Sequence, residues 1–188
     1  LYGNELIRVN IAQLLYDIQK YFAGFNVYSS AQFYTKKLRE PVDIKNIDEI
    51  LSPDATNFSN IFNNYKSKDF LWKNRFEARI KELIPELQAA DTVTFYDKLI
   101  FRLAYYDEQY DLSDISEGTI KGLILNLLIN MPLSENCPLL AIDEPESNLD
   151  FKNQLIILDI IKRLAREKGI SCVFNTHYPD HALKISDD

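Results

Sequence analysis

The residues of this chain best suited to chemistry are two adjacent acids, Asp143 and Glu144, which directly follow an apolar run. Continuous apolar runs are typical of buried strands in parallel sheets, and ligand sites of α/β proteins form beyond the carboxyl ends of such strands. Two acids at that place can divide the work, because one can hold Mg²⁺ while the next activates a water molecule. The pair therefore indicates nucleotide hydrolysis, although two acids can also simply end a strand.

Two further segments are candidates for contributing to the same site. Ser116, Glu117 and Gly118 open a predicted helix, where backbone N–H groups and the positive end of the helix dipole attract an anion. Asp150, which follows the acid pair, is placed either to cap the next helix or to act across an interface between subunits. The alternative explanation of the first segment is an ordinary cap by Ser116, with Gly122 at a tight packing contact.

A histidine ends the apolar segment that begins at Val173. The imidazole of His177 at that position can reach a γ-phosphate or orient an attacking water molecule. The alternative is a solvated loop histidine. The other histidine, His181, opens the last predicted helix and is interpreted as a surface or capping residue.

Hydrophobic periodicity predicts the elements that position these residues. Helices are expected over residues 6–22, 58–65, 70–87, 119–131, 151–168 and from 181, and strands over residues 27–35, 92–96, 99–105, 139–142 and 171–175. Pro85 favours a kink or early stop in the third helix. The strand–helix–strand order across residues 139–175 predicts a βαβ unit with parallel neighbouring strands, and hence an α/β fold.

Composition limits the functional classes. The formal net charge of −7 over 188 residues argues against a surface that coats DNA generally, although it leaves room for a local basic patch. No apolar stretch approaches the roughly 20 residues of a membrane helix. Cys137 and Cys172 are interpreted as free thiols in a reducing compartment, which predicts a cytoplasmic protein. The chain begins at Leu1 without an initiator Met, so we expect the natural amino terminus to lie upstream.

Taken together, these segments resemble the ATP-binding-cassette (ABC) ATPases. Residues 139–145 look like the Walker B segment, residues 147–150 like the D-loop, residues 115–119 like the signature loop and residues 176–177 like the switch histidine. Ser-Glu-Gly-Thr in the signature and Asp-Glu-Pro-Glu-Ser after the strand are similar to the RecF/SMC-like predicted ATPases, a group with DNA-repair and phage-defence members.

The resemblance implies a P-loop NTPase head of the ABC type, with a parallel βαβ core and a mainly helical lobe. Residues 1–90 would form the helical lobe and residues 91–188 the carboxyl-terminal part of the core, within one discontinuous domain. It implies that Glu144 and His177 are catalytic and that Asp143 holds Mg²⁺. The nucleotide-binding residues for ATP would be Ser116, Glu117, Gly118 and Asp150.

The implied partners are a second ABC head in a homodimer and, beyond it, DNA or a nuclease or toxin partner, with no insertion into a membrane. One departure is clear: the chain has no Gly-x-x-x-x-Gly-Lys-Ser/Thr loop, and no Gln-loop can be assigned. We therefore expect an ATPase in the full-length protein and an inactive chain in isolation. The alternatives are the nucleotide-binding subunit of an ABC transporter, which residues 176–183 resemble, and a non-catalytic interaction module.

Overall fold

The computed structural model describes residues 26–29, 32–33, 35–45, 50–131, 139–178 and 180. The helices predicted over residues 6–22 and from residue 181 lie outside the described residues, as do Cys137 and His181.

One end of the molecule is a three-stranded parallel sheet in the order β1-β6-β7. Its strands are β1 (Asn26–Ser29), β6 (Leu139–Asp143) and β7 (Ser171–Asn175), and helix α6 (Phe151–Lys168) connects the last two. The predicted βαβ unit, with its parallel strands, is therefore confirmed. Gly169 ends α6 in the left-handed conformation, with a φ of 62°, which is the usual reason for glycine at this position.

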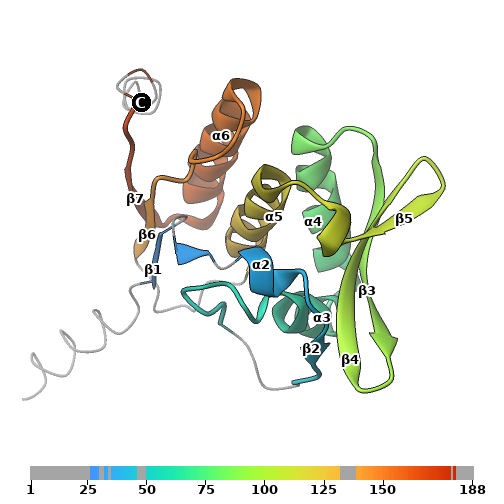
Figure 1. The fold of residues 1–188 in the computed structure, drawn as a ribbon. Helices are drawn as coiled ribbons and strands as arrows, with labels where there is room; N and C mark the ends of the chain where they lie inside the picture. Colours follow the sequence, from blue (N-terminus) through green and yellow to red (C-terminus); the bar gives the residue numbers. More distant parts are fainter. Residues whose placement is uncertain are drawn as a thin grey trace, which may run out of the picture.

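The second sheet is antiparallel and lies at the far end of the molecule (Figure 1). It contains β2 (Val42–Asp43), β3 (Leu87–Phe95), β4 (Lys98–Tyr105) and β5 (Glu108–Asp111). The strands predicted over residues 92–96 and 99–105 are confirmed as β3 and β4, which pair as an antiparallel hairpin, but β3 begins earlier than expected. Helix α4 (Phe70–Leu83) ends before Pro85, which confirms the early stop that this proline favoured within the helix predicted over residues 70–87.

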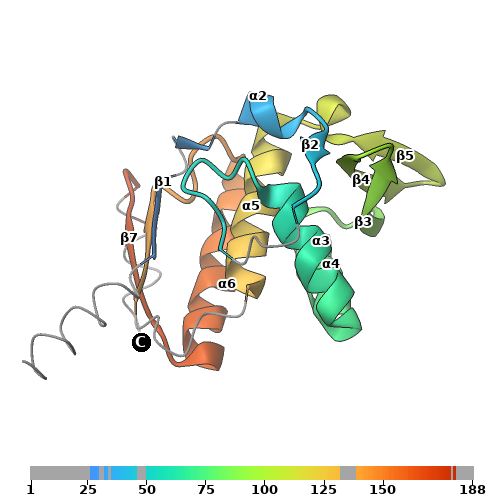
Figure 2. The same ribbon diagram turned by 90° about the horizontal axis from the view of Figure 1, so that it is seen from below.

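Helices fill the space between the two sheets, as Figures 1 and 2 show. The helix α5 (Glu117–Asn130) follows the short turn η2 (Leu112–Asp114) and lies at the centre, between the parallel sheet and α3 (Phe58–Lys68) with α4. The helix predicted over residues 119–131 is confirmed, and α5 is buried on all sides from Ile120 to Asn130. The short α2 (Thr35–Leu38) packs near α5.

Aromatic rings hold α3 and α4 against the antiparallel sheet. The ring of Phe62 makes edge-to-face contacts with Trp72, Phe76 and Phe101 at centroid distances of 5.4, 5.1 and 4.9 Å. Such pairs contribute about 0.5–1.5 kcal/mol each beyond the area they bury. The helical layer and the antiparallel sheet therefore share one core.

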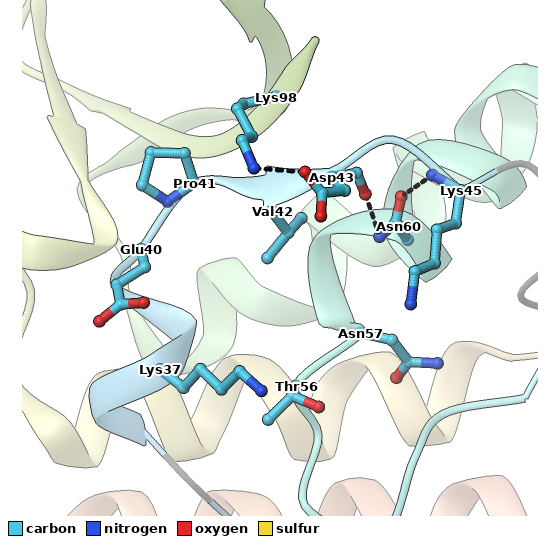
Figure 3. A pocket seen from close by; sticks show the side chains of 10 residues that line it. All are labelled: Lys37, Glu40, Pro41, Val42, Asp43, Lys45, Thr56, Asn57, Asn60 and Lys98. Carbon is cyan, nitrogen blue, oxygen red and sulfur yellow. Dashed lines mark hydrogen bonds and ion pairs between the residues drawn. The ribbon is translucent and has the colours of Figure 1, made fainter.

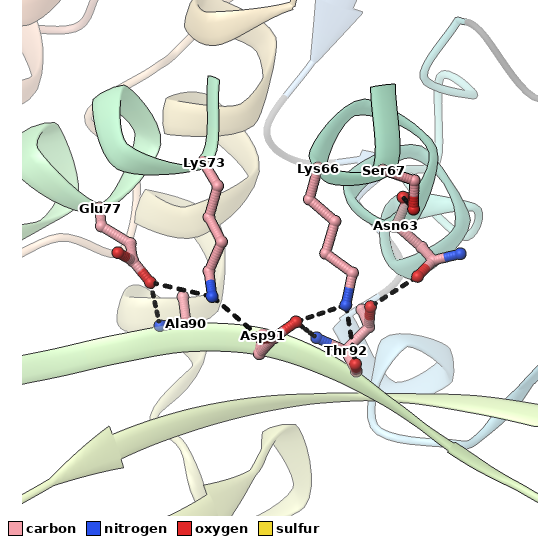
Figure 4. Close-up of polar contacts among 8 residues, drawn as sticks. All are labelled: Asn63, Lys66, Ser67, Lys73, Glu77, Ala90, Asp91 and Thr92. Carbon is pink, nitrogen blue, oxygen red and sulfur yellow. Dashed lines mark hydrogen bonds and ion pairs between the residues drawn. The ribbon is translucent and has the colours of Figure 1, made fainter. Parts of the chain in front are cut away.

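A polar cluster around Asp91 of β3 reinforces the same junction (Figure 4). The Asp91 carboxylate pairs with Lys66 of α3 and with Lys73 of α4, the latter at 2.9 Å. Burial alone would raise the pKa of Asp91, but the hydrogen bonds from the two lysines outweigh it and hold the pKa below its ordinary value. One acid of the sheet thus fixes both helices.

Candidate active site

The candidate site lies at the carboxyl edge of the parallel sheet, where Asp143 ends β6. In the register of the sheet, Asp143 is level with Ser29 of β1 and Asn175 of β7. The Ser29 hydroxyl donates to Oδ2 of Asp143 and the Asn175 amide to Oδ1, both at 3.0 Å. Because both donors are neutral, they orient the carboxylate without cancelling its charge.

Glu144 and His177 meet beside this edge. Nε2 of His177 lies 2.6 Å from Oε1 of Glu144, and their side chains are 74% and 28% exposed. Glu144 has a φ of 48°, in the left-handed region that a glutamate rarely occupies, and its N–H donates to the Asn175 carbonyl at 2.9 Å. Strained backbone of this kind persists only where the surrounding structure enforces it, and it often occurs at functional sites.

Sequence reasoning missed a buried contact that holds the histidine segment. Glu146 is 1% exposed, and its Oε1 accepts a hydrogen bond from the Thr176 hydroxyl. Its Oε2 has no hydrogen-bond partner among the described residues. The contact ties the residue next to His177 to the turn after β6. The only sequence signal was a third acid placed directly after a proline in the run 143–146.

The turn that follows β6, residues 144–149, is closed by its own backbone. The N–H of Ser147 donates to the Glu144 carbonyl at 3.0 Å, and Asn148 takes a φ of 62°. Asp150 then caps α6 by accepting from the N–H of Asn153 at 3.0 Å. The predicted cap is confirmed, and the predicted nucleotide-binding role of Asp150 stays a prediction.

The start of α5 packs directly on this turn. Ser116 caps α5 by accepting from the N–H of Thr119 at 3.2 Å, and both Ser116 and Glu117 are exposed. A Cβ on Gly118 would lie 2.7 Å from the Asn148 carbonyl oxygen, so glycine is needed here for close packing. Two segments predicted to act on nucleotide are therefore adjacent in one chain, with Ser116 and Glu117 open to solvent.

The candidate site suits a metal ion that is bound partly by the protein and partly by substrate phosphates. The described residues contain no cluster of three or more acids, histidines or cysteines that would form an all-protein metal site. Mg²⁺ is usually held by one or two carboxylates together with phosphate oxygens and water, which matches the single oriented carboxylate of Asp143.

A separate cavity of about 220 Å³ lies between α2, β2 and the start of α3 (Figure 3). Lys98 pairs with Asp43 there, and this hydrogen bond holds the pKa of Asp43 below its ordinary value. The lining residues combine lysines with acids and include none of the residues of the sheet edge: Lys37, Glu40, Pro41, Val42, Asp43, Lys45, Thr56, Asn57, Asn60 and Lys98. The mixed charges and the absence of histidine distinguish the lining of this cavity from the sheet edge, which stays the candidate active site.

Comparison with known proteins gives a family match. A family model described as "AAA domain, putative AbiEii toxin, Type IV TA system" matches residues 21–179. The molybdate import ATP-binding protein MolC of Haemophilus influenzae is 37% identical over 60 residues, covering 32% of this chain and 24% of that protein. The spermidine/putrescine import ATP-binding protein PotA of Aster yellows witches'-broom phytoplasma is 25% identical over 201 residues, covering 90% and 46%. The chain thus spans less than half the length of these relatives.

Solved structures show the same fold. A structure published as "Structural biochemistry of ATP-driven dimerization and DNA stimulated activation of SMC ATPases" has a TM-score of 0.52 at 16% identity and covers 65% of this chain and 76% of that chain. An Smc head domain derived from Pyrococcus furiosus has a TM-score of 0.50 at 17% identity, covering 71% and 34%. The predicted fold, an α/β head of the ABC and SMC type, is confirmed. Among the helices of the described residues, none has the length and apolar character needed to span a bilayer.

Proposed function

Because the chain belongs to the family of AAA domains described as putative AbiEii toxin of a type IV TA system, we propose that the whole protein binds and hydrolyses ATP as an ABC-type ATPase. The observation that supports this most strongly is the contact between Glu144 and His177 beside the oriented carboxylate of Asp143. An acid, an imidazole and a cation ligand converge at the carboxyl edge of a parallel sheet, where α/β proteins bind nucleotides.

In the proposed mechanism, Glu144 accepts a hydrogen bond from the attacking water and polarises it for in-line attack on the γ-phosphate. His177, in contact with Glu144, orients the water or the γ-phosphate. Asp143, with the Ser29 hydroxyl beside it, would hold Mg²⁺. When bound, Mg²⁺ would neutralise charge on the phosphates.

A second head would complete the site. Ser116 and Glu117 are exposed, although their helix starts against the turn after Glu144, so they face outward from their own chain. Exposed backbone N–H groups at a helix start suit the γ-phosphate of a nucleotide held by another subunit. We therefore propose a homodimer that binds ATP between heads, with Asp150 near the interface.

The test is the rate of ATP hydrolysis by the full-length protein and by its Glu144→Gln variant. Loss of a positioned general base typically lowers turnover about 100-fold or more, so we expect a loss of that size with ATP binding retained. Glu86→Gln, a change of the same kind at an exposed turn, should keep the parent rate. A Glu144→Gln variant that hydrolyses ATP as fast as the parent would show that the assigned role is wrong.

We further propose that ATP hydrolysis serves DNA repair or phage defence, with DNA or a nuclease or toxin partner responding to it. The similarity to a structure described with DNA-stimulated SMC ATPases supports this direction. The measurement is the turnover of ATP with and without duplex DNA, at low salt where phosphate contacts are strongest. A rate that DNA leaves unchanged would contradict the DNA-directed role.

A transporter subunit is the second candidate, because the two relatives named above are import ATP-binding proteins. Such a subunit would co-purify from detergent extracts with a membrane protein, whereas a repair or defence ATPase would not. A non-catalytic interaction module is the third candidate, and it would neither bind nor hydrolyse ATP as the full-length protein.

A further inference from the structure

Lys121, in the second turn of α5, is a buried cation beside the candidate site. The residue is 3% exposed. Its Nζ lies 3.5 Å from Oγ of Ser147, in the turn after β6, and 4.0 Å from Oε1 of Glu117. Both distances are long for a charge-assisted hydrogen bond, which is normally about 2.7–2.9 Å.

The other buried polar residues of α5 are better satisfied. The Asn126 amide donates to the Phe76 carbonyl at 3.0 Å, and the Asn130 amide donates to the Asn126 carbonyl at 2.7 Å. Oδ1 of Asn130 accepts from Arg79 at 2.6 Å. These contacts fix α5 against α4 and account for polar residues inside the core. Lys121 makes no comparably short contact in the described part of the chain.

Stability does not explain a lysine at this position. Burial lowers the pKa of Lys121, because it disfavours the ammonium form, while the nearby carboxylates of Glu117 and Glu144 act in the opposite direction. An apolar side chain of similar length would avoid the desolvation of the charge and would usually be as stable or more stable. The charge itself therefore needs a functional reason.

The surroundings of Lys121 supply that reason. The start of α5 presents Ser116 to solvent, while Gly118 packs on the backbone of Asn148. Residues 144–149 carry Glu144 at one end and Ser147, the hydroxyl partner of Lys121, in the middle. The Gly118 contact and the Lys121 ammonium group thus link the start of α5 to the turn that carries Glu144.

We propose that Lys121 is a positioning residue that couples the phosphate-contacting start of α5 to Glu144 of the same chain. It acts through its contact with Ser147, which lies in the turn that begins at Glu144. Each head would then sense the nucleotide of its partner at Ser116 and adjust hydrolysis of its own nucleotide at Glu144. This inference rests on the proposed ATPase function.

The experiment compares full-length Lys121→Met, Lys121→Arg and the parent in ATP turnover, ATP binding and thermal unfolding. Methionine keeps the length and packing of the side chain but removes its charge, so we expect kcat to fall about tenfold or more, as when a positioning group is displaced. The Kd for ATP should stay within about twofold and the unfolding temperature should not fall. Lys121→Arg should restore most of kcat.

Two further variants complete the design. Lys81→Met makes the same change at an exposed lysine of α4 and should leave kcat unchanged. Ser147→Ala should lower kcat as well, and the double variant with Lys121→Met should lose less than the product of the two single losses, because the two residues act as one unit. Independent losses that multiply would overturn the coupling through Ser147.

The outcomes separate this inference from the proposed function. A parent protein without ATP hydrolysis would contradict the proposed function. An active parent with an equally active Lys121→Met variant would overturn only the role of Lys121. A Lys121→Met variant that loses activity together with stability would make Lys121 a structural residue and would overturn the inference as well.

Discussion

Gly118 provides a test of how the start of α5 is packed, through the substitution Gly118→Ala. The added Cβ would lie 2.7 Å from the backbone oxygen of Asn148. Carbon and oxygen atoms cannot approach so closely without a shift, and the backbone of the turn cannot swing aside as a side-chain tip can. Gly122 in the same helix offers a matched control, because its added Cβ would meet only the flexible Cδ1 of Leu83, at 3.3 Å.

The expected magnitude follows from comparing the two variants. Replacing a helical glycine with alanine stabilises the helix by about 1 kcal/mol, and this gain applies to both positions. Overpacking against a rigid neighbour costs about 1–3 kcal/mol, and this cost applies only at Gly118. We therefore expect Gly118→Ala to be less stable than Gly122→Ala by about 1–3 kcal/mol, with Gly122→Ala equal to the parent or slightly more stable.

Urea unfolding of the full-length variants, followed by circular dichroism, measures this difference in the free energy of unfolding. It is obtained from the two urea concentrations at half-unfolding when both variants have the same dependence of free energy on urea. The same variants should separate in ATP turnover, because a displaced 144–149 turn moves Glu144. If Gly118→Ala proves as stable as Gly122→Ala, the close contact between α5 and Asn148 is not present in the protein and the reasoning fails.

Three other predictions follow from single contacts. Thr176→Val removes the hydrogen bond to the buried Glu146 and should cost about 1–3 kcal/mol in urea unfolding, with Thr176→Ser as the control that keeps the hydroxyl. The pKa of Asp91 is lowered in the folded protein. The stability that Asp91 contributes is therefore fully present above pH 3.8, the ordinary pKa of an aspartate, and is lost as the pH falls through its lower pKa in the folded state. The parent should therefore lose its stability advantage over Asp91→Asn on acidification, and a constant difference from pH 6 to pH 3 would refute this. Asp150→Ala removes the cap of α6 and should cost about 1 kcal/mol, whereas Asp150→Asn should keep most of it.

The local parts of the fold were predictable from the sequence. The apolar run before Asp143, the helix after Asp150 and its glycine end identify a βαβ unit by residue type and spacing alone. The strand β5 was missed because Glu108–Asp111 is polar and pairs at the edge of its sheet, where burial leaves no apolar pattern. The complete burial of α5 was also missed, since it depends on the helices and sheet that surround it.

The candidate site was likewise predictable from the sequence only in part. The contact of Glu144 with His177 follows from two strand ends at one edge of a sheet, and was therefore within reach of the sequence. The roles of Glu146 and Lys121 were not, because each depends on a single long-range contact with a neighbour whose position only the fold determines. Gly118 illustrates the limit: a glycine at a helix start suggests an anion, which stays a prediction, while its close packing on Asn148 depends on a neighbour that only the fold brings near.

The central claim is that Glu144 and His177 act as one hydrolytic unit at the sheet edge. The most direct measurement is a double-mutant cycle of ATP turnover in the full-length protein, with Glu144→Gln, His177→Ala and their combination. Residues that act as a unit give strongly non-additive losses, so the double variant should be about as slow as the slower single variant. Losses that multiply, or a Glu144→Gln variant that turns over ATP like the parent, would contradict the claim.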